Sequence, residues 1–305
     1  MTSRRALPRD LPRSFTVEHA LESGVARNRL DALDMVAPFR GVRLRATLAN
    51  DFDARCRALA TTFRAGDAFT GPTAALLWGM PVPKRLEATS ILHVSSHLPA
   101  RAMRRPGVIG SGRSSGEATT HHGIAILQPW EVCRSLAPML SLDDLVAVMD
   151  FIVTGERGRY PLSSPGALDG YLRSQEHRPG MARMRRAAPW SRVGAWSRPE
   201  SILRLVLLRA SLPEPELNLE LPLPSGGKLI PDMAWPQYRV AAEYNGIHHD
   251  KPGQRVHDLS RIDDFTDIGW VTVNVERVEL FQSPLSAATR LAHRLASRGW
   301  EMPRG

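Results

Sequence analysis

The alternation of apolar and polar positions predicts a β-hairpin in the C-terminal third of the chain. Residues 228–235 and 238–244 follow the period-two pattern of strands, and the Pro-Gln pair at 236–237 is typical of a turn. Upstream, residues 198–210 are apolar around most of a helix, and the Ser-Arg-Pro-Glu run at 197–200 is a helix-start signal. The pattern therefore predicts a helix that packs on a sheet, with Leu203, Val206 and Leu207 facing inward.

The hairpin register predicts that two acidic side chains share one face of the sheet. A two-residue turn sets Trp235 opposite Tyr238, which brings Asp232 opposite Ala241. Because side chains alternate between the two faces, Glu243 then lies on the face of Asp232, at a diagonal position. Asn245 falls on that face too.

Two carboxylates at this spacing suit one hard divalent cation. Mg²⁺, or Mn²⁺ in its place, prefers oxygen ligands and keeps room for water and a substrate phosphate. Asp232 and Glu243 are the predicted ligands, with the backbone carbonyl of Tyr244 as a third. The alternative is that both acids are solvated on the polar face of a half-buried hairpin. A lone charge in the weakly polar strand VAAEYNG favours the metal site, because an unpaired buried charge is costly.

Further polar residues follow the hairpin and complete a candidate catalytic group. His248 is suited to orient or deprotonate a water, or to protonate a leaving oxygen. Asp258 and Arg261 are one helical turn apart, so Arg261 can hold a phosphate oxygen while Asp258 fixes His248 or Arg261. Glu200 has two competing roles: the cap of the helix that begins after Ser197, which we favour, or an additional metal ligand.

These residues resemble a known family. The segment from about 197 to 300 resembles the very-short-patch-repair-like endonuclease domains of the PD-(D/E)xK superfamily. The matching stretches are SRPES (197–201), PELNLEL (215–221), PDMAWPQYRVAAEYNGIHH (231–249) and DLSRIDDFTDIGW (258–270). The resemblance implies a restriction-endonuclease-like fold and metal-dependent cleavage of DNA. Asn245 stands where the family at large has a lysine. The repair-like branch relies on a histidine instead, which His248 can supply, so both an active nuclease and an inactive descendant stay open.

The first 50 residues predict a small winged helix. Two amphipathic helices, at 15–23 and 25–33, are separated by Gly24, and residues 39–45 alternate like a strand and turn. The predicted DNA contacts are at the start of the second helix and in the wing: Arg27, Asn28, Arg29, Arg40 and Arg43. The alternative is a plain helical hairpin with solvated arginines. The stretch FTVEHALESGVARNRLDAL with FRGVRL is similar to the N-terminal region of AbiEi-type antitoxins.

The central part of the chain predicts an α/β domain without a catalytic group. AFTGPTAALLWGMPVP (68–83), a strand near 91–94 and LAPMLSLDDLVAVMDFIV (136–153) extend the AbiEi-like resemblance, with Ser141 as a helix cap. The following stretch, residues 177–199, has no acidic residue. Its arginines alternate with tryptophans, which suits either phosphate binding or packing on a neighbouring domain. The predicted phosphate contacts there are Arg183, Arg185 and Arg186.

Composition agrees with a nucleic-acid partner. The 305 residues include 40 Lys and Arg against 31 Asp and Glu, a net charge of +9, which favours a polyanion. Nearly all basic residues are arginine, which reflects either phosphate recognition or a GC-rich genome. Cys56 and Cys133 lack metal or disulfide spacing and are expected to be buried. The N-terminus lacks the apolar run of a signal peptide and no membrane span is evident, so a cytoplasmic location is expected.

The sequence thus predicts an α/β (α+β) protein of several domains. These are a winged helix at 1–50, an α/β middle domain at 51–175, a basic connector at 176–196 and a nuclease-like mixed sheet flanked by helices at 197–305. The expected function is Mg²⁺-dependent DNA hydrolysis in repair, phage defence or a toxin–antitoxin-like system. The alternative is a non-catalytic DNA-binding regulator with a degenerate nuclease fold. DNA is the expected partner, and a homodimer or a toxin or antitoxin protein are the other partners considered.

Overall fold

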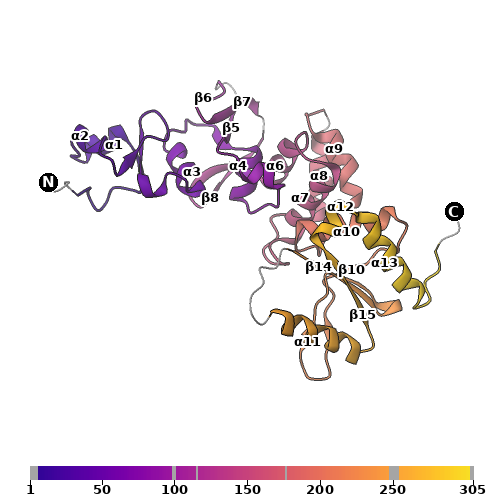
Figure 1. The fold of residues 1–305 in the computed structure, drawn as a ribbon. Coiled ribbons are helices and arrows are strands. Elements are labelled where there is room, and N and C mark those ends of the chain that lie inside the picture. Colours follow the sequence, from indigo (N-terminus) through magenta and orange to yellow (C-terminus); the bar gives the residue numbers. More distant parts are fainter. Residues whose placement is uncertain (1–5, 98–100, 115, 176, 247–253, 303–305) are drawn as a thin grey trace. The chain divides into compact units, whose positions relative to one another are not determined.

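Contacts between segments divide this mixed α/β chain into two units (Figure 1). The computed structural model describes all residues except 1–5, 98–100, 115, 176, 247–253 and 303–305. The N-terminal unit comprises residues 1–79 and 83–136, and the C-terminal unit comprises 80–82 and 137–305. Residues 137–175 therefore belong with the C-terminal unit, whereas the sequence pattern had grouped them with the middle domain.

The N-terminal unit begins with a small helix-and-sheet module. Its three strands pair in the order β1-β3-β2. The side chain of Thr16 caps the first helix, whereas the second helix has only one turn and its N-cap, Ala26, offers no side-chain acceptor. Both helices are shorter than predicted. The elements are β1 (Ser14–Thr16), α1 (Val17–Glu22), α2 (Arg27–Leu30), β2 (Met35–Val36), β3 (Val42–Arg45) and η1 (Ala46–Leu48).

A six-stranded mixed sheet forms the rest of this unit, in the order β6-β7-β5-β4-β9-β8. The strand predicted near residues 91–94 is present as β5, and Cys56 and Cys133 are fully buried as expected. The strands are β4 (Asp67–Phe69), β5 (Leu92–His97), β6 (Arg104–Arg105), β7 (Val108–Ser114), β8 (Ala118–His121) and β9 (Ile124–Leu127). The helices are α3 (Phe52–Ala60), α4 (Gly71–Leu77), α5 (Lys84–Glu87) and α6 (Pro129–Leu136).

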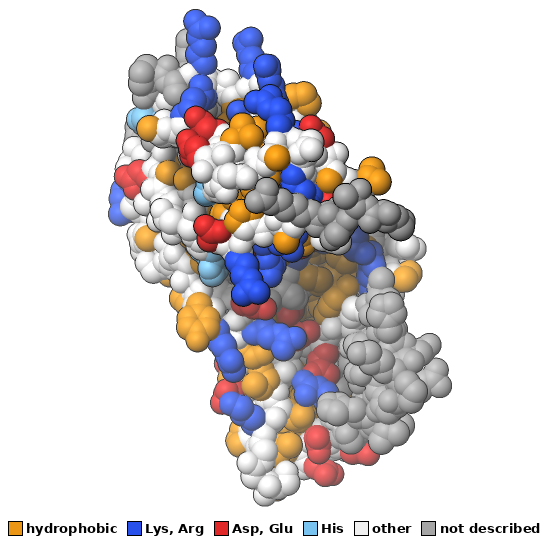
Figure 2. Space-filling view, turned by 90° about the vertical axis from the view of Figure 1, so that its left-hand side faces the viewer, with side chains coloured by type: hydrophobic (Ala, Val, Ile, Leu, Met, Phe, Trp, Pro, Cys, Tyr) orange, Lys and Arg blue, Asp and Glu red, His pale blue; other side chains and the backbone are white. Residues whose placement is uncertain are grey.

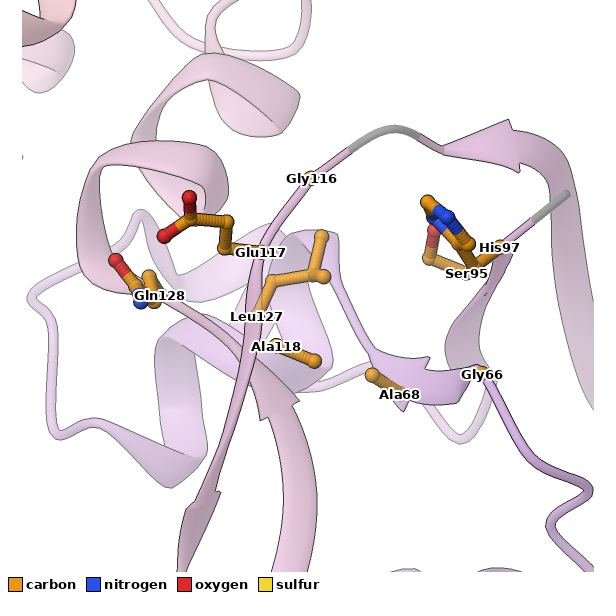
Figure 3. A pocket seen from close by; sticks show the side chains of 9 residues that line it. All are labelled: Gly66, Ala68, Ser95, His97, Gly116, Glu117, Ala118, Leu127 and Gln128. Carbon is orange, nitrogen blue, oxygen red and sulfur yellow. The ribbon is translucent and has the colours of Figure 1, made fainter.

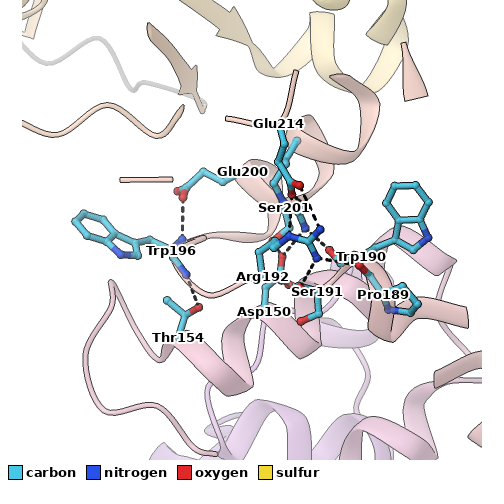
Figure 4. Close-up of polar contacts among 12 residues, drawn as sticks. Asp150, Thr154, Pro189, Trp190, Ser191, Arg192, Trp196, Glu200, Ser201 and Glu214 are labelled. Atoms are coloured by element: carbon cyan, nitrogen blue, oxygen red, sulfur yellow. Dashed lines mark hydrogen bonds and ion pairs between the residues drawn. The ribbon is translucent and has the colours of Figure 1, made fainter. Parts of the chain in front are cut away.

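Helices lead into the C-terminal unit, and two of them are joined by buried charges. Ser141 caps α7 as predicted, by accepting from the backbone N–H of Asp144 at 3.1 Å. On the same helix, Asp150 accepts from Ser201 Oγ at 2.8 Å and from Arg204 Nη2 at 3.3 Å, both on α10 (Figure 4). The helices are α7 (Leu142–Thr154), α8 (Pro165–Ser174), α9 (Met181–Ala187), η2 (Ala188–Trp190) and α10 (Arg198–Arg209).

The C-terminal sheet is mixed and is covered on both faces, as Figure 1 shows (order β10-β13-β14-β15). Because side chains alternate, Ala242 faces the core under α10 and α13, whereas Ala241 faces Phe265 of α11. The strands are β10 (Glu216–Leu217), β11 (Leu221–Pro222), β12 (Lys228–Leu229), β13 (Met233–Trp235), β14 (Val240–Asn245) and β15 (Val271–Glu276). The remaining elements are η3 (Pro236–Tyr238), α11 (Gln254–Asp267), α12 (Arg277–Gln282) and α13 (Pro284–Ala296).

The hairpin forms with a different turn from the predicted one. Residues 236–239 make a four-residue connection, in which η3 is followed by Arg239 in the left-handed conformation (φ 51°). Trp235 therefore pairs with Val240 rather than Tyr238. The two extra residues preserve the alternation of faces, so Asp232 and Glu243 still share one face. Extending the register by one position sets them directly opposite each other, where a diagonal was predicted.

The first predicted strand, residues 228–235, is broken in two. β12 pairs with β11 in a separate two-stranded sheet, and β13 starts only at Met233. Pro231 lies between them and has no N–H to continue a ladder. The predicted helix at 198–210 is confirmed as α10, with Leu203 and Leu207 buried. Among the described residues, no helix is long and apolar enough to cross a lipid bilayer.

Candidate functional site

Asp232 lies at the bend just before β13, and both its carboxylate and its backbone carbonyl accept hydrogen bonds. Its Oδ2 accepts from the backbone N–H of Tyr244 at 2.7 Å, across the hairpin. Its carbonyl accepts from the backbone N–H of Asn218 at 3.1 Å. The carboxylate is therefore fixed against the C-terminal half of β14, next to Glu243. Tyr244, predicted to contribute its carbonyl, contributes its N–H to this contact.

Glu243 carries an ion pair with Arg261. The Nε of Arg261 donates to Oε1 of Glu243 at 2.7 Å, and its Nη2 contacts the same oxygen. Nη2 also donates to the carbonyl of Ile230 at 2.9 Å. Arg261 thus ties α11 to the hairpin, and in this state its guanidinium neutralises the charge of Glu243.

Glu200 performs the predicted cap and also lies beside the acidic pair. Its backbone N–H donates to Ser197 Oγ at 3.4 Å, and its Oε2 accepts from the N–H of Trp196 at 2.8 Å (Figure 4). The side-chain amide of Asn218 donates to the same oxygen at 3.1 Å. Because Asn218 also contacts the backbone of Asp232, one residue links the cap to the hairpin. Glu200 therefore acts as the predicted cap, and its role as an additional metal ligand stays a prediction.

The three carboxyl groups repel one another electrostatically. The pKa of Asp232 is raised to about 7, first by burial, then by the charge of Glu200, and further by that of Glu243. The Tyr244 N–H and the charge of Arg261 oppose this rise. Burial likewise raises the pKa of Glu200, against its hydrogen bonds. At Asp232, the negative charges of Glu200 and Glu243 therefore outweigh the positive charge of Arg261.

The cluster matches a magnesium site in donor chemistry but is not a closed cage. Across the described ranges, no three His, Cys, Asp or Glu side chains are grouped so as to hold a metal ion by themselves. Mg²⁺ is usually held by one or two carboxylates together with water and substrate phosphates. The excess of carboxylate charge around Asp232 fits that kind of open site.

The other predicted catalytic residues are placed only in part. Asn245 ends β14, and its amide donates to Glu276 at 3.2 Å rather than to Glu243. Asp258 lies in α11, one turn before Arg261, and its side chain lies outside the described part of the structure. His248 lies outside the described residues.

Asn218 is the contact residue that sequence reasoning missed. It adopts the left-handed conformation (φ 48°), which asparagine tolerates better than most residues. Its Nδ2 donates to the carbonyl of Gly194 at 2.7 Å as well as to Glu200. The asparagine within the PELNLEL stretch was the available signal, but nothing local connects it to Glu200 or Asp232.

The predicted DNA contacts of the N-terminal module fall into two groups. Arg29 forms a two-pronged ion pair with Asp34, at 2.9 and 2.7 Å. Arg43 donates to the carbonyl of Leu30 and to Asp31, so it links β3 to the end of α2 within the module. The remaining three side chains are exposed and available to a ligand: Arg27, Asn28 and Arg40.

Most of the connector is folded into the C-terminal unit. Arg183 donates to the carbonyl of Leu140 at 2.6 Å, and Arg185 donates to that of Leu172 at 2.9 Å. Arg186 is exposed. On the face drawn in Figure 2, basic side chains stand among acidic and hydrophobic ones instead of forming one continuous patch. These observations support the packing role of the connector more strongly than the phosphate-binding role.

A separate hollow of about 390 Å³ lies on the six-stranded sheet (Figure 3). Its floor includes Ala68 and Leu127, and Ser95 and His97 lie at one end. Ser95 is buried, and its hydroxyl has no hydrogen-bond partner among the described residues. None of the residues predicted to be functional lines this hollow.

Comparison with known proteins gives relatives but no family. No protein-family model matches the chain, and no solved structure matches it. The chain is similar to two proteins of Mycobacterium tuberculosis, "Uncharacterized protein MT2308" of strain CDC 1551 / Oshkosh and "Uncharacterized protein Rv2248" of strain ATCC 25618 / H37Rv. Each is 31% identical over 129 residues, which cover 42% of this chain and 48% of the relative. The chain therefore spans about half the length of the curated relatives that it matches.

Proposed function

We propose that the C-terminal unit is a metal-dependent DNA endonuclease that acts in the cytoplasm. The observation that carries the proposal is the carboxylate cluster of Glu200 on α10, Asp232 at the bend before β13 and Glu243 on β14. Asp232 has its pKa raised to about 7 by burial and by the other two charges. A divalent cation is the ligand that best relieves such an excess of negative charge.

Different residues of the chain would bind the metal, orient its ligands and bind the substrate phosphate. Asp232 and Glu243 would hold Mg²⁺ or Mn²⁺, and the Tyr244 carbonyl would be a third ligand. When bound, the cation supplies an acidified water and neutralises charge on the attacked phosphate. The Tyr244 N–H fixes the rotamer of Asp232. Arg261, when it is released from Glu243, can donate its planar guanidinium to a phosphate oxygen.

A second function is favoured by two observations at the same hairpin. Asn245 replaces the lysine of the resembled family and binds Glu276, and Arg261 already neutralises Glu243. Both suit a fold that holds DNA without cleaving it. In this regulator, the N-terminal module reads the DNA sequence and the C-terminal unit only adds affinity.

Cleavage of supercoiled plasmid and single-stranded DNA by the full chain, with and without Mg²⁺ or Mn²⁺, tests the proposal. Asp232→Asn and Glu243→Gln keep the side-chain shape and remove the charge. We expect each to slow cleavage by more than about 100-fold, because even the outer partners of metal ligands cost about 10–100-fold when they are removed. DNA binding without metal should stay close to that of the wild type.

Glu216→Gln is the matched control. Glu216 is an exposed acid on β10 of the same sheet, where it pairs with Ala234 rather than with Asp232. Its substitution should leave cleavage unchanged. Cleavage at the wild-type rate by both cluster variants would exclude this site. A wild type that binds DNA but cleaves no substrate with either metal would favour the regulator.

A further inference from the structure

A row of arginines runs beside the outer edge of the C-terminal sheet. Arg290 and Arg294 are four residues apart on α13, about 6 Å along the helix, and therefore lie on the same side of it. Arg298 follows four residues later, just past the end of the helix. All three side chains are exposed.

The row follows β15, which is the edge strand of its sheet. Arg290 donates to the carbonyl of Asn274, and Arg298 donates to that of Gly269 at 3.3 Å. Helix and strand therefore run in opposite directions, with Arg294 between the two contacts. By covering the carbonyl of Asn274, Arg290 also protects the edge strand from pairing with another strand. In the described part of the chain, the guanidinium of Arg294 has no hydrogen bond or ion pair, whereas its backbone carbonyl accepts from Ser297 Oγ at 2.8 Å.

A cleft of about 600 Å³ lies between this row and the strand. Thr272 Oγ1 and Asn274 Oδ1 are buried here without a hydrogen-bond partner among the described residues. Among the described residues, Glu276 is the one acid that lines the cleft, and it already accepts from Asn245. The polar and basic lining residues are Thr272, Asn274, Arg290, His293, Arg294 and Ser297.

The strand register connects the cleft to the carboxylate cluster. Asn274 pairs with Glu243 in the parallel ladder of β14 and β15. Adjacent strands lie about 4.8 Å apart, so the cleft begins one strand away from Glu243. A carboxylate cluster repels a polyanion, so a substrate phosphate needs cationic side chains close by.

We propose that the cleft between α13 and β15 binds the sugar–phosphate backbone of DNA next to the bond to be cleaved. Arginine forks match phosphate oxygens, and Ser297 and His293 add further hydrogen-bond donors. The proposal rests on the proposed nuclease function and assigns it a substrate-binding surface. The side chain of Arg294 is free to contact a phosphate. Arg290 and Arg298 belong to the same row, and they donate to the carbonyls of Asn274 and Gly269.

Binding of a fluorescent DNA duplex to the full chain in EDTA, measured across a salt series, tests the proposal without cleavage. Arg294→Ala should weaken binding and flatten the log–log salt slope by about 0.9 unit, the value of one phosphate contact. Arg294→Lys should keep most of the slope. Arg173→Ala, which removes an exposed arginine from α8 of the same unit, should leave affinity and slope unchanged.

Kinetics with metal separate this surface from the catalytic cluster. Arg294→Ala should raise KM and leave kcat close to that of the wild type. If the wild type cleaves DNA but Arg294→Ala has the affinity, slope and KM of Arg173→Ala, the cleft is excluded while the nuclease function stands. If duplex RNA binds more tightly than DNA, the assignment to DNA is overturned. If the wild type neither binds nor cleaves DNA, both proposals fail.

Discussion

At the scale of single residues, the pKa of the Asp232 carboxyl group is set by opposing effects. Its hydrogen bond from the Tyr244 N–H favours the charged form, as does the charge of Arg261. Burial and the neighbouring charge of Glu200 outweigh both and raise its pKa from 3.8 to about 7. A residue in this state takes up a proton or a cation readily, which is what an open metal site requires.

The raised pKa predicts a pH-dependent stability. The folded chain holds the Asp232 proton more tightly than the unfolded chain, so this group stabilises the fold most below its ordinary pKa of 3.8. That contribution is lost as the pH rises through about 7. In EDTA, Asp232→Asn should therefore gain Tm relative to the wild type between acidic and mildly alkaline pH. Thermal unfolding of both proteins over this range measures it.

Addition of Mg²⁺ provides the complementary measurement. A ligand that binds only the folded state adds stability by mass action. Mg²⁺ should raise the Tm of the wild type more at alkaline than at acidic pH, because protons compete for Asp232, and should raise that of Asp232→Asn less. A difference in Tm between the two proteins that does not vary with pH would contradict the raised pKa.

At the scale of elements, a buried ion pair joins α7 to α10. Arg204 is fully buried and contacts Asp150, Glu214 and the carbonyl of Trp190 (Figure 4). Burial raises the pKa of Asp150 in spite of its contacts with Arg204 and with the Arg192 N–H. The ion pair between Arg204 and Asp150 fixes α10, and the first turn of α10 carries Glu200. The carboxylate cluster thus depends on packing between helices that are distant in sequence.

Removal of one partner should be costly. Arg204→Ala leaves Asp150 buried without its cation, and we expect the free energy of unfolding to fall by about 3–5 kcal/mol. Urea denaturation of the full chain measures this loss. Arg173→Ala, at an exposed arginine of α8, should change stability by less than about 0.5 kcal/mol. If the two variants unfolded at the same urea concentration, the ion pair of Arg204 would not stabilise the packing of α7 on α10.

At the scale of the whole molecule, the two units are expected to share the recognition of DNA. The N-terminal module exposes Arg27 and Asn28 on α2, whereas Arg29 and Arg43 are used inside the module. Contacts to base edges give sequence preference, and contacts to phosphates give salt-dependent affinity. Under the proposed function, the N-terminal unit would select sequences and the C-terminal cleft would hold the DNA backbone.

Asn28→Ala and Arg294→Ala should therefore affect different properties of DNA binding, the first sequence preference and the second overall affinity. Asn28→Ala should change the sequences that the full chain selects from a random DNA pool and keep the salt slope. Arg294→Ala should weaken all sequences alike. Arg29→Ala should instead lower the Tm, because it breaks the ion pair with Asp34. Unaltered sequence preference in Asn28→Ala would remove α2 from the reading surface.

The sequence by itself determined the elements whose signals are local. Ser141 and Ser197 cap their helices as predicted, since a cap depends only on residues three positions apart. The hairpin formed where alternation predicted it, and Asp232 and Glu243 share a face because the face depends only on the parity of the turn length. The mixed α/β class followed from the same patterns.

Tertiary structure decided the partners of those residues. The four-residue turn set Asp232 opposite Glu243, and no local signal distinguishes it from a two-residue turn of the same parity. Arg261 was predicted as a phosphate ligand, yet it pairs with Glu243 because α11 packs on that face of the sheet. Asn218 and the row beside β15 are brought to the site from elsewhere in the chain. Such contacts depend on packing between distant segments, which periodicity and capping signals do not encode.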